Sequence, residues 1–442
     1  MKLLFLENRY KTHFFEEVVK DLIEKHDIFW IVQNPQFTPK IGETNIIPFP
    51  NAKSNYSPKD SVNIEYDKII KSDRQVNFFE KKDKSFFYYY ADQIDKCISE
   101  IRPDFVFGES TAFHELLAIE VCKQRNITYL NPSSCRYPSG RFSFYKYDTL
   151  APYLGSEDVL PKDEALSIID GIVNKKSVPD YMKRVSMSKT KILKDKAKKI
   201  TSFISGEKYN TPNPLVKYKI EKSKKQNIDT WESSAISGVK KNNTFKVLYP
   251  LQMQPEANID VWGRKWRNQS DLIRKIIDYL PENCDLYVKP NPKSKYELSD
   301  ELVDICQKGQ RIIQLGHAVK MQDVFNQVDM IITVTGTIAI ESILANKPVI
   351  TLIRTLNNDS DNCLFLNEIS ELTDIVAMVK ENEFPKSSID ERLDFINMLN
   401  QKSFKGIVSD PFSDPKCLEK SNIQNIVKAF NLIFQNQEPQ KY

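Results

Sequence analysis

The sequence MIITVTGTIAIESILANKPVI, residues 330–350, combines the signals of a strand, a glycine turn, a helix and a second strand. The apolar runs at its two ends are short and rich in β-branched residues, whereas the segment between them repeats apolar residues at helical spacing. A strand that leads through a helix into another strand is the unit from which parallel sheets are built. This stretch therefore predicts a Rossmann-like α/β fold.

Similar signals extend along the chain on both sides of this stretch. In the second half, apolar runs indicate further strands at FKVLYPL (245–251), CDLYVKP (284–290), RIIQL (311–315) and PVITLI (348–353). In the first half, strands are predicted at residues 2–6, 28–32, 105–108 and 127–130, with helical periodicity between them. The chain is thus predicted to contain two series of parallel strands.

The length of 442 residues is more than one ordinary core holds, so we expect two α/β domains. A lysine-rich stretch with few acids, residues 181–226, interrupts the alternation. The predicted parts are a Rossmann-like domain at 1–150, a helical insertion or linker at 151–238, a second Rossmann-like domain at 239–405, and a C-terminal helix at 406–442 that packs back on the first domain.

Two interpretations of the lysine-rich stretch stay open. Its charges are typical of a solvated helical face. Clustered lysines also attract anionic lipid headgroups or an anionic ligand. The stretch by itself does not decide between them.

The composition excludes several classes of protein. A net charge of +4 from 63 basic and 59 acidic residues is too small for a dedicated nucleic-acid binder. Seven scattered cysteines without zinc or CxxC spacing indicate reduced cytosolic thiols, and the four histidines show no ligand spacing. No run approaches the about 18 to 20 apolar residues of a membrane span. We expect a cytoplasmic protein whose contact with the inner face of the cell membrane, if any, is peripheral.

The turn inside residues 330–350 supplies the first candidate site, because ligands of open parallel sheets bind beyond the carboxyl ends of strands. Gly336 permits a tight turn there. Thr335, Thr337 and the free amides of the first helical turn can hold a phosphate or a ribose, with Glu341 one turn further along. The alternative is that Thr337 only caps the helix.

Two loops that follow neighbouring strands are further candidates in the same half. Lys289 ends the run LYVK, and the proline-stiffened loop behind it holds Asn291 and Pro292. The charge of Lys289 suits a phosphate, although a plain surface turn has the same composition. His317 follows the run RIIQL and can reach the same ligand, unless it is an ordinary surface histidine.

The loop YPLQMQPE, residues 249–256, follows the first strand of the second half and carries Gln252, Gln254 and Glu256. A carboxylate at the end of a strand can act as a base or as a nucleophile. Glu256 is therefore a candidate catalytic residue, and the two glutamines are candidate ligand-binding residues. A solvated glutamate in a loop is the alternative.

In the first half, Glu109 and Ser110 follow one predicted strand, and Arg136 and Arg141 follow the next. Glu109 is the candidate second carboxylate. The two arginines can bind an anionic group through forked hydrogen bonds, with Ser110 beside them. Ser110 also suits the N-cap of the helix that follows.

The motifs YPLQMQPE, LYVKPNP, TVTGTIAIESILANKPVI and RYPSGRF together resemble the capsule polysaccharide biosynthesis family, which includes retaining Kdo transferases of bacterial capsule and O-antigen assembly. The resemblance is strongest over residues 245–352. It implies a GT-B-like pair of Rossmann-like domains facing a central cleft. It also implies that the C-terminal half holds a nucleotide sugar and that the N-terminal half holds the acceptor.

The resemblance further implies roles for single residues. Relatives that use CMP-linked sugars carry a His-Pro pair where this chain has Asn291 and Pro292, so the nucleotide and the sugar stay open. The nucleophile of the retaining enzymes corresponds by loop position to Glu256, which is a glutamate where they have an aspartate. Glu256 is thus expected to be nucleophile or base, with Glu109 as the second carboxylate.

We therefore predict a glycosyltransferase of hexosyl or Kdo type that moves a sugar from a nucleotide donor onto a bacterial surface polysaccharide or its lipid-linked precursor. The donor is a substrate, and neither a cofactor nor a metal is expected, since the DSD triplet at 359–361 is typical of a turn. The expected partners are the nucleotide sugar and a glycan or glycolipid acceptor. The rival predictions are a sugar-nucleotide epimerase and a non-catalytic scaffold of capsule assembly.

Overall fold

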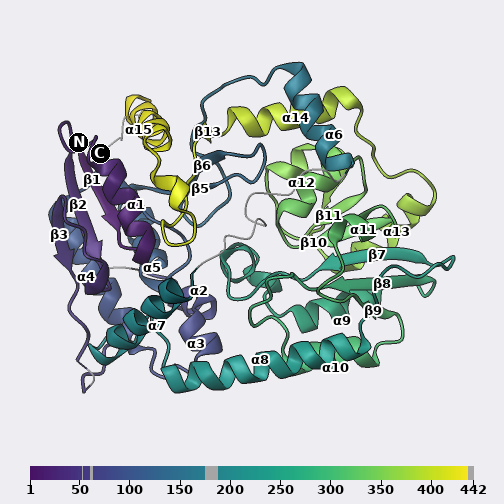
Figure 1. Ribbon diagram of the computed structural model, residues 1–442, viewed down its shortest axis with the longest axis horizontal. Helices are drawn as coiled ribbons and strands as arrows, with labels where there is room; N and C mark the ends of the chain where they lie inside the picture. The colour runs from purple at the N-terminus through teal and green to yellow at the C-terminus, as the bar shows by residue number, and fades with distance from the viewer. Residues whose placement is uncertain (52, 60–62, 175–187, 437–442) are drawn as a thin grey trace. The chain divides into compact units, whose positions relative to one another are not determined.

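The computed structural model describes residues 1–51, 53–59, 63–174 and 188–436 (Figure 1). The chain forms two compact units. Unit 1 comprises Met1–Leu160, Val178–Pro214 and Met398–Tyr442, and unit 2 comprises Pro161–Ser177 and Leu215–Asn397. Each unit has its own sheet and hydrophobic core, so the predicted fold class of two Rossmann-like α/β halves is confirmed.

The sheet of unit 1 has seven strands in the order β13-β6-β5-β4-β1-β2-β3. Strands β1 to β5 pair in parallel, whereas β6 and β13 run antiparallel at one edge. Since the chain leaves β1 toward β2 and returns to β4 on the other side of β1, the carboxyl end of β1 is a topological switch point, where such sheets bind ligands. The strands are β1 (Lys2–Leu6), β2 (Asp27–Val32), β3 (Glu43–Ile46), β4 (Phe105–Phe107), β5 (Thr128–Ser134), β6 (Arg141–Lys146) and β13 (Phe404–Lys405).

The core of unit 1 stacks aromatic rings from the sheet against the last helix. The ring centroids of Phe5 and Phe107 lie 5.1 Å apart, and those of Phe107 and Phe430 lie 4.8 Å apart. Because β13 pairs with β6, the chain has returned to unit 1 by Met398, ahead of the predicted boundary at residue 406. The helices of unit 1 are α1 (Arg9–Val19), α2 (Tyr66–Ser72), α3 (Arg74–Phe78), α4 (Ser85–Ile101), α5 (Phe113–Gln124), α7 (Lys189–Ile204) and α15 (Lys420–Gln435).

The sheet of unit 2 is entirely parallel and has the order β12-β11-β10-β7-β8-β9. Numbered along the unit, this is the Rossmann order 3-2-1-4-5-6. Its switch point lies between β7 and β10, where the strand order reverses. The strands are β7 (Phe245–Pro250), β8 (Cys284–Lys289), β9 (Ile312–Gln314), β10 (Met330–Thr333), β11 (Val349–Thr351) and β12 (Cys363–Phe365).

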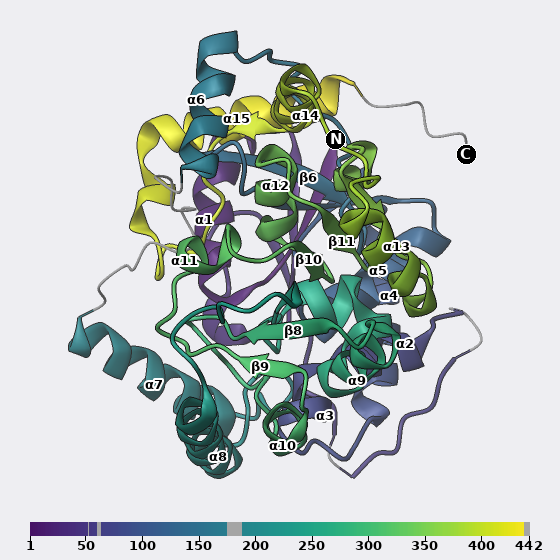
Figure 2. The same cartoon turned by 90° about the vertical axis from the view of Figure 1, so that its right-hand side faces the viewer.

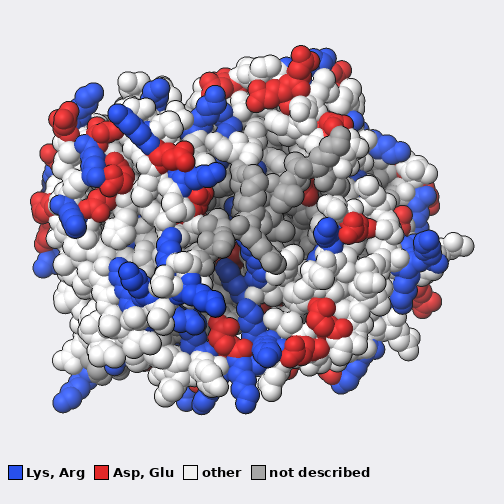
Figure 3. Space-filling view, viewed as in Figure 1, with Lys and Arg blue, Asp and Glu red and all other residues white. Residues whose placement is uncertain are grey.

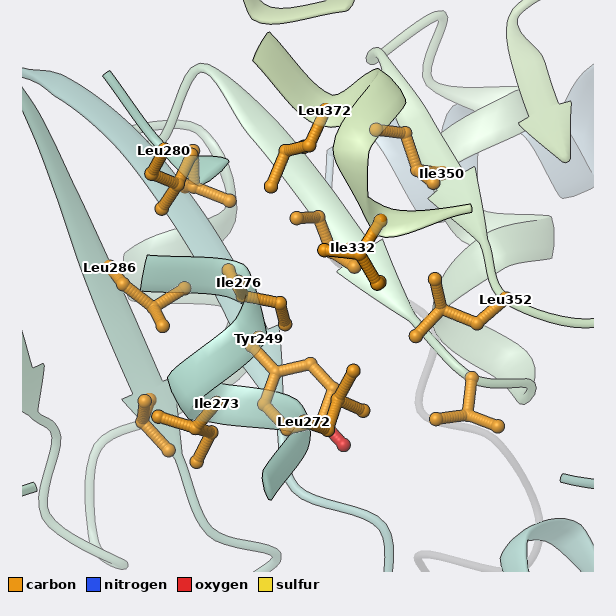
Figure 4. Close-up of a cluster of buried hydrophobic side chains, with 14 of the residues drawn as sticks. Tyr249, Leu272, Ile273, Ile276, Leu280, Leu286, Ile332, Ile350, Leu352 and Leu372 are labelled. Atoms are coloured by element: carbon orange, nitrogen blue, oxygen red, sulfur yellow. The ribbon is translucent and has the colours of Figure 1, made fainter. Parts of the chain in front are cut away.

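Helices cover both faces of the sheet of unit 2. Figure 2 shows α10 beside β9, and α12 lies on the opposite face against β10 and β11. On the first face, Ile276 and Leu372 pack against Tyr249 and Ile332 of the sheet (Figure 4). The helices of this unit are α6 (Lys162–Val173), α8 (Pro214–Ser234), α9 (Gln269–Tyr279), α10 (Asp300–Lys308), α11 (Met321–Phe325), α12 (Thr337–Leu344) and α13 (Leu372–Lys380), and α14 (Ile389–Gln401) leads back to unit 1.

The stretch 151–238, predicted as one insertion or linker, is divided between the two units. Helices α6 and α8 belong to unit 2, and α7 belongs to unit 1. Helix α8 is fixed to its unit by Trp231, which is fully buried and donates its Nε1 to the carbonyl oxygen of Leu315 at 3.0 Å. Residues 181–187 of the lysine-rich stretch lie outside the described residues.

Helix α7 turns lysines toward unit 1 and apolar side chains toward solvent. The Nζ of Lys198 lies 3.8 Å from the centroid of the Phe37 ring, and the Nζ of Lys191 donates to the carbonyl oxygen of Phe412 at 2.6 Å. On the opposite side, Leu193 and Ile204 are 68% and 76% exposed. A lysine over an aromatic face gains cation–π attraction and is partly desolvated. Helix α7 is therefore more than a solvated charged face.

Candidate functional site

Unit 2 gathers predicted binding residues at the carboxyl ends of β7 and β10. Gln252, which follows β7, donates its Nε2 to the Thr333 Oγ1 at 3.2 Å and to the carbonyl oxygen of Thr335 at 3.5 Å. These bonds tie the loop after β7 to the turn after β10, across the switch point of the sheet. The sequence predicts Gln252, Thr335 and Gly336 as binding residues. The structure brings these three residues together at one edge of the sheet.

The turn after β10 depends on a glycine. Gly336 has φ 107° and ψ 174°, a region that is essentially restricted to glycine. Helix α12 begins directly after it at Thr337, which is 9% exposed, and Glu341 lies one turn further along. The first amides of a helix carry a partial positive charge and point at the ligand in many anion sites. The turn thus presents backbone donors to an anion.

Thr335 places a buried hydroxyl in this turn. Its side chain is 2% exposed, and its hydroxyl has no hydrogen-bond partner in the part of the chain that the structure describes. A buried hydroxyl without a partner costs about 1 to 3 kcal/mol. A phosphate or hydroxyl group of a ligand at this turn would supply the missing partner.

Replacing Thr335 with valine is expected to change stability and binding in opposite directions. Valine keeps the shape but removes the unpaired hydroxyl, so the free energy of unfolding should rise by about 1 kcal/mol while the affinity for a bound nucleotide falls about tenfold. Thermal unfolding with and without nucleotide measures both. The control is Thr373→Val, whose exposed hydroxyl donates to the carbonyl oxygen of Tyr279 at 2.8 Å and should leave binding unchanged. A Thr335→Val protein that binds nucleotide as tightly as the wild type contradicts the role of this hydroxyl.

Lys289 is a buried cation at the same edge of the sheet, on the far side of β7 from this turn. It ends β8 opposite Pro250 of β7 and is 3% exposed. Its Nζ donates to the carbonyl oxygen of Pro290 at 3.2 Å, and within the described ranges it has no ion-pair partner. Burial lowers the pKa of Lys289 to about 8, although the charge of Glu232 acts in the opposite direction. A buried ammonium with so little compensation favours the binding of an anion.

Glu232, near the end of α8, is a site residue that sequence reasoning missed. Its Oε1 accepts from the backbone N–H of His317 at 2.9 Å and lies 2.5 Å from the Nδ1 of the same residue. Burial acts to raise the pKa of Glu232, but the hydrogen bonds from His317 outweigh it and lower the pKa. No motif marks this glutamate within the lysine-rich helix, because its partner lies 85 positions away.

His317 also joins the loop after β8. Its Nε2 lies 2.9 Å from the Ser294 Oγ, which donates to the carbonyl oxygen of Asn291 at 3.1 Å. The side-chain oxygen of Asn291 accepts from the backbone of Lys293 at 2.8 Å, and Pro292 is exposed. The predicted residues His317 and Asn291 are thus linked by hydrogen bonds through Ser294. The side-chain amide of Asn291 shapes the loop after β8.

The loop after β7 presents Glu256 and encloses Gln254. The Oε1 of Glu256 lies 2.8 Å from the Nζ of Lys295, and the glutamate side chain is 27% exposed. Gln254 is 7% exposed and donates its Nε2 to the Asp260 Oδ1 at 2.9 Å, while its Oε1 accepts from Gln269 at 3.0 Å. Glu256 is therefore accessible to a substrate, whereas Gln254 supports the loop from within and has no contact that favours its predicted role in binding.

In unit 1, Glu109 lies at the carboxyl end of β4 in a network of donors. Its Oε1 lies 2.5 Å from the Nζ of Lys11, and its Oε2 accepts from the Asn8 Nδ2 at 3.0 Å and the Thr111 hydroxyl at 3.3 Å. Burial acts to raise the pKa of Glu109, but the charge of Lys11 and these hydrogen bonds outweigh it and lower the pKa. Glu109 is thus ionised at neutral pH and is a poor proton donor.

Two of the other predicted residues of unit 1, Ser110 and Arg141, are buried and hydrogen-bonded within the unit. Ser110 is fully buried, and its hydroxyl accepts from the Asn131 Nδ2 at 3.0 Å. Arg141 is 6% exposed and donates to the hydroxyl and carbonyl oxygens of Ser403, both at 2.7 Å. It therefore links β6 to the returning C-terminal segment, and its contacts do not support the predicted anion binding. Arg136 is exposed in the turn between β5 and β6.

Residues 159–357, which contain α6, α8 and the strands β7 to β11, match the model of a known protein family. It is the capsule polysaccharide biosynthesis protein family. The resemblance predicted from the motifs is confirmed for the three motifs within this range, whereas the fourth, RYPSGRF at 136–142, lies outside it. The capsule family match includes Gln252, Glu256, Lys289 and the Thr335–Gly336 turn, and it does not extend to Glu109.

Similarities to solved structures cover almost the whole chain at low identity. The Thermosulfurimonas dismutans KpsC, a β-Kdo 2,7 transferase, is 8% identical with a TM-score of 0.39, covering 99% of this chain and 100% of that one. The UDP-GlcNAc 2-epimerase of Neisseria meningitidis is 12% identical with a TM-score of 0.30 (98% and 100% covered), and MurG of Acinetobacter baumannii is 8% identical with a TM-score of 0.28 (98% and 99% covered). The search of curated proteins gives no match. At these TM-scores the likenesses carry no weight for the function.

The described part of the chain holds neither a group of metal ligands nor a helix that could span a membrane. In residues 1–51, 53–59, 63–174 and 188–436, no three His, Cys, Asp or Glu side chains are arranged to hold a metal ion. No helix in those ranges is long and apolar enough to cross a membrane. The DSD triplet at 359–361 lies at the end of a short 3-10 helix, Leu356–Asp359, that follows β11.

Proposed function

We propose that this protein is a glycosyltransferase of bacterial surface polysaccharide assembly whose unit 2 binds the nucleotide sugar. The observation that carries the proposal is that a buried cation without an ion-pair partner and a buried hydroxyl without a hydrogen-bond partner, both judged among the described residues, lie at the same edge of the sheet of unit 2. Lys289 ends β8, and Thr335 lies in the glycine turn after β10, with β7 between them. The family match over the same residues supports the connection with capsule polysaccharide.

The charges of this site fit the phosphate of the donor. Lys289 and the first amides of α12 would neutralise the negative charge that the nucleotide gains as it leaves the sugar. Gln252, Thr337 and Glu341 are the side chains that would contact the ribose or the sugar. Since Lys289 is a single buried cation and Asn291 adds no charge, we favour a monophosphate leaving group, which means a CMP-linked donor and an acidic sugar such as Kdo.

Glu256 is the carboxylate that we propose to react. It is accessible, and Lys295 holds it in place at 2.8 Å. It would either attack the anomeric carbon, with the bond to the nucleotide breaking, or take the proton of the acceptor hydroxyl as that oxygen attacks. Glu109, ionised beside Lys11 in unit 1, is the carboxylate that we propose for the acceptor-binding half. No step requires a metal ion.

The surface of helix α7 favours the proposal that the acceptor is presented at a lipid surface. Its outward face carries Leu193 and Ile204, 68% and 76% exposed, and Ile200, 47% exposed. Lys194 and Lys196 flank this apolar stripe. Apolar side chains flanked by lysines are the composition of a helix that lies in the interface of an anionic bilayer. We therefore propose peripheral contact with anionic lipid through α7 and a lipid-linked glycan as acceptor.

The test of this function measures donor selectivity and then transfer. Thermal unfolding is recorded with CMP-, UDP- and GDP-linked sugars, and a donor at a hundred times its dissociation constant should raise the melting temperature by about 5 °C. The selected donor is then incubated with lipid-linked glycan in phosphatidylglycerol vesicles, and both the glycan product and co-sedimentation of the protein are measured. We expect selective stabilisation by a CMP-linked sugar, vesicle binding and a lengthened glycan.

Three outcomes contradict parts of this proposal. If the protein epimerises the sugar of the donor in the absence of an acceptor, it is a sugar-nucleotide epimerase instead of a transferase. No stabilisation by any nucleotide sugar indicates a non-catalytic scaffold. Transfer by a protein that stays in the supernatant refutes the lipid contact of α7 and leaves the transferase activity standing.

A further inference from the structure

Two arginines of unit 1 converge on one backbone oxygen. The Arg9 Nη2 donates to the carbonyl oxygen of Asn210 at 2.6 Å, and the Arg74 Nη2 donates to the same oxygen at 3.1 Å. Arg9 begins α1 directly after β1, Arg74 begins α3, and Asn210 lies in the loop after α7. Three segments far apart in the sequence thus place two guanidinium groups within a few ångströms of each other.

Neither guanidinium is neutralised by a paired carboxylate. In the described part of the chain, no carboxylate oxygen lies within ion-pair distance of Arg9 or Arg74, although both side chains are half-buried. Burial lowers the pKa of Arg74 to about 10, and the charge of Arg9 contributes in the same direction, whereas the charges of Asp73, Glu207 and Glu115 act to raise it. Two like charges held together in a partly desolvated place repel each other, and an anion between them would remove that repulsion.

The three carboxylates whose charges act on Arg74 accept hydrogen bonds from other donors. Glu207 accepts from the backbone N–H groups of Tyr209 and Asn210 at 3.0 and 2.6 Å. Asp73 caps α3 by accepting from two backbone N–H groups, at 2.9 and 3.0 Å. Glu115 accepts from the Asn8 Nδ2 at 2.8 Å. Among the described residues, Arg9 donates to Asn210 and Thr211 and Arg74 donates to Asn210, so most of the five N–H groups of each guanidinium are left for a ligand.

The two arginines lie in a part of the fold where parallel sheets commonly bind ligands. The carboxyl end of β1 is the switch point of the sheet of unit 1. Arg9 is held there at φ 42°, in the left-handed region, and its backbone N–H donates to the Glu7 Oε1 at 2.6 Å. The side-chain oxygen of Asn210 is buried without a partner in the described chain. Strain and unpaired polar groups at one point of a fold are typical of a functional site.

Lysines and arginines also gather on the surface of this part of unit 1. In Figure 3, blue side chains are dense over the region that carries α2, α3 and α7. The positive electrostatic potential of these side chains attracts anions toward Arg9 and Arg74 and raises the local anion concentration.

We propose that Arg9 and Arg74 bind a phosphate group of the acceptor through forked, charge-assisted hydrogen bonds. Guanidinium groups match the geometry of phosphate oxygens, and two of them suit the double charge of a phosphate or diphosphate. The binding of a phosphate follows from this geometry alone. Its assignment to the acceptor rests on the proposed function, which gives the donor to unit 2.

The test uses the full-length protein and inorganic pyrophosphate in isothermal titration. The wild type is expected to bind at two sites, one through Arg9 and Arg74 and one through Lys289. Arg9→Gln and Arg74→Gln should each weaken the first site at least tenfold and leave the second unchanged. Arg74→Lys, which keeps the charge without the fork, should weaken the first site less than Arg74→Gln does. The matched control is Arg125→Gln, because Arg125 has its own carboxylate, Asp95, at 2.6 Å.

The outcomes separate this inference from the proposed function. If Arg9→Gln and Arg74→Gln are folded by circular dichroism and still bind two pyrophosphates, the arginine site is refuted. If saturating CMP displaces pyrophosphate from the arginine site, the phosphate belongs to the nucleotide, and the assignment to the acceptor is refuted. If the arginine site binds normally but no nucleotide binds at Lys289, the proposed function fails and the phosphate site stands.

Discussion

The Glu256→Gln protein is expected to transfer sugar about a thousandfold more slowly than the wild type, while its affinity for the nucleotide sugar changes less than about twofold. Glutamine keeps the size of the side chain but can neither attack the anomeric carbon nor accept a proton. The effect should therefore fall on kcat and leave KM nearly unchanged. Single-turnover transfer to the acceptor, together with titration of the donor, measures the two quantities.

The matched control is Glu368→Gln. Glu368 also pairs with a lysine, at 3.5 Å from Lys265, but its side chain is 63% exposed and lies outside the proposed site. It should retain full activity. A Glu256→Gln protein with a kcat within about tenfold of the wild type would show that this carboxylate does not react, because general base catalysis alone contributes about a hundredfold or more.

Lys289→Ala should raise the dissociation constant of the nucleotide sugar about a hundredfold. Removing one partner of a buried charge pair costs about 2 to 5 kcal/mol, and each 1.4 kcal/mol is a tenfold change in affinity. The control is Lys308→Ala, whose side chain is 76% exposed on α10 of the same unit. Donor binding that survives Lys289→Ala unchanged refutes the phosphate role of this lysine.

The pKa of Lys289 adds a pH dependence to the same measurement. Burial lowers this pKa to about 8, so the free protein loses the ammonium charge as the pH rises through that value. Since the anion binds the charged form, the dissociation constant should rise about tenfold between pH 7 and pH 9. In Lys289→Ala, this rise should disappear. A wild type whose donor affinity is constant over that range contradicts the assignment.

Several features of the site were predictable because they depend on local sequence. The spacing of apolar residues is set by the period of each element, so β7, β8 and β10 were located before any tertiary contact was known. Polar residues that directly follow such strands must lie at one edge of a parallel sheet. The positions of Lys289, Gln252 and the Thr335–Gly336 turn at this edge were predicted in this way.

The predicted roles of Arg141 and Gln254 did not anticipate the hydrogen bonds of their side chains. The burial and the partners of a side chain depend on segments that are distant in the sequence. Arg141 follows a strand in the same way as Lys289, yet its donors are taken by Ser403, which is 262 positions away. Gln254 lies two positions from Gln252 but is enclosed by Asp260 and Gln269. In the sequence, these residues cannot be told apart from Lys289, whose ammonium has no ion-pair partner among the described residues.

The sequence by itself determined the α/β class, the presence of two Rossmann-like halves and the polar residues that follow the strand ends, since each follows from short-range patterns. Only the tertiary structure decided which charges are compensated. Glu232 reaches His317 across 85 positions, and Arg9 meets the carbonyl oxygen of Asn210 across 201. The free energy of a charge depends on its burial and on its neighbours, and both are fixed by the packing of segments that the sequence keeps apart.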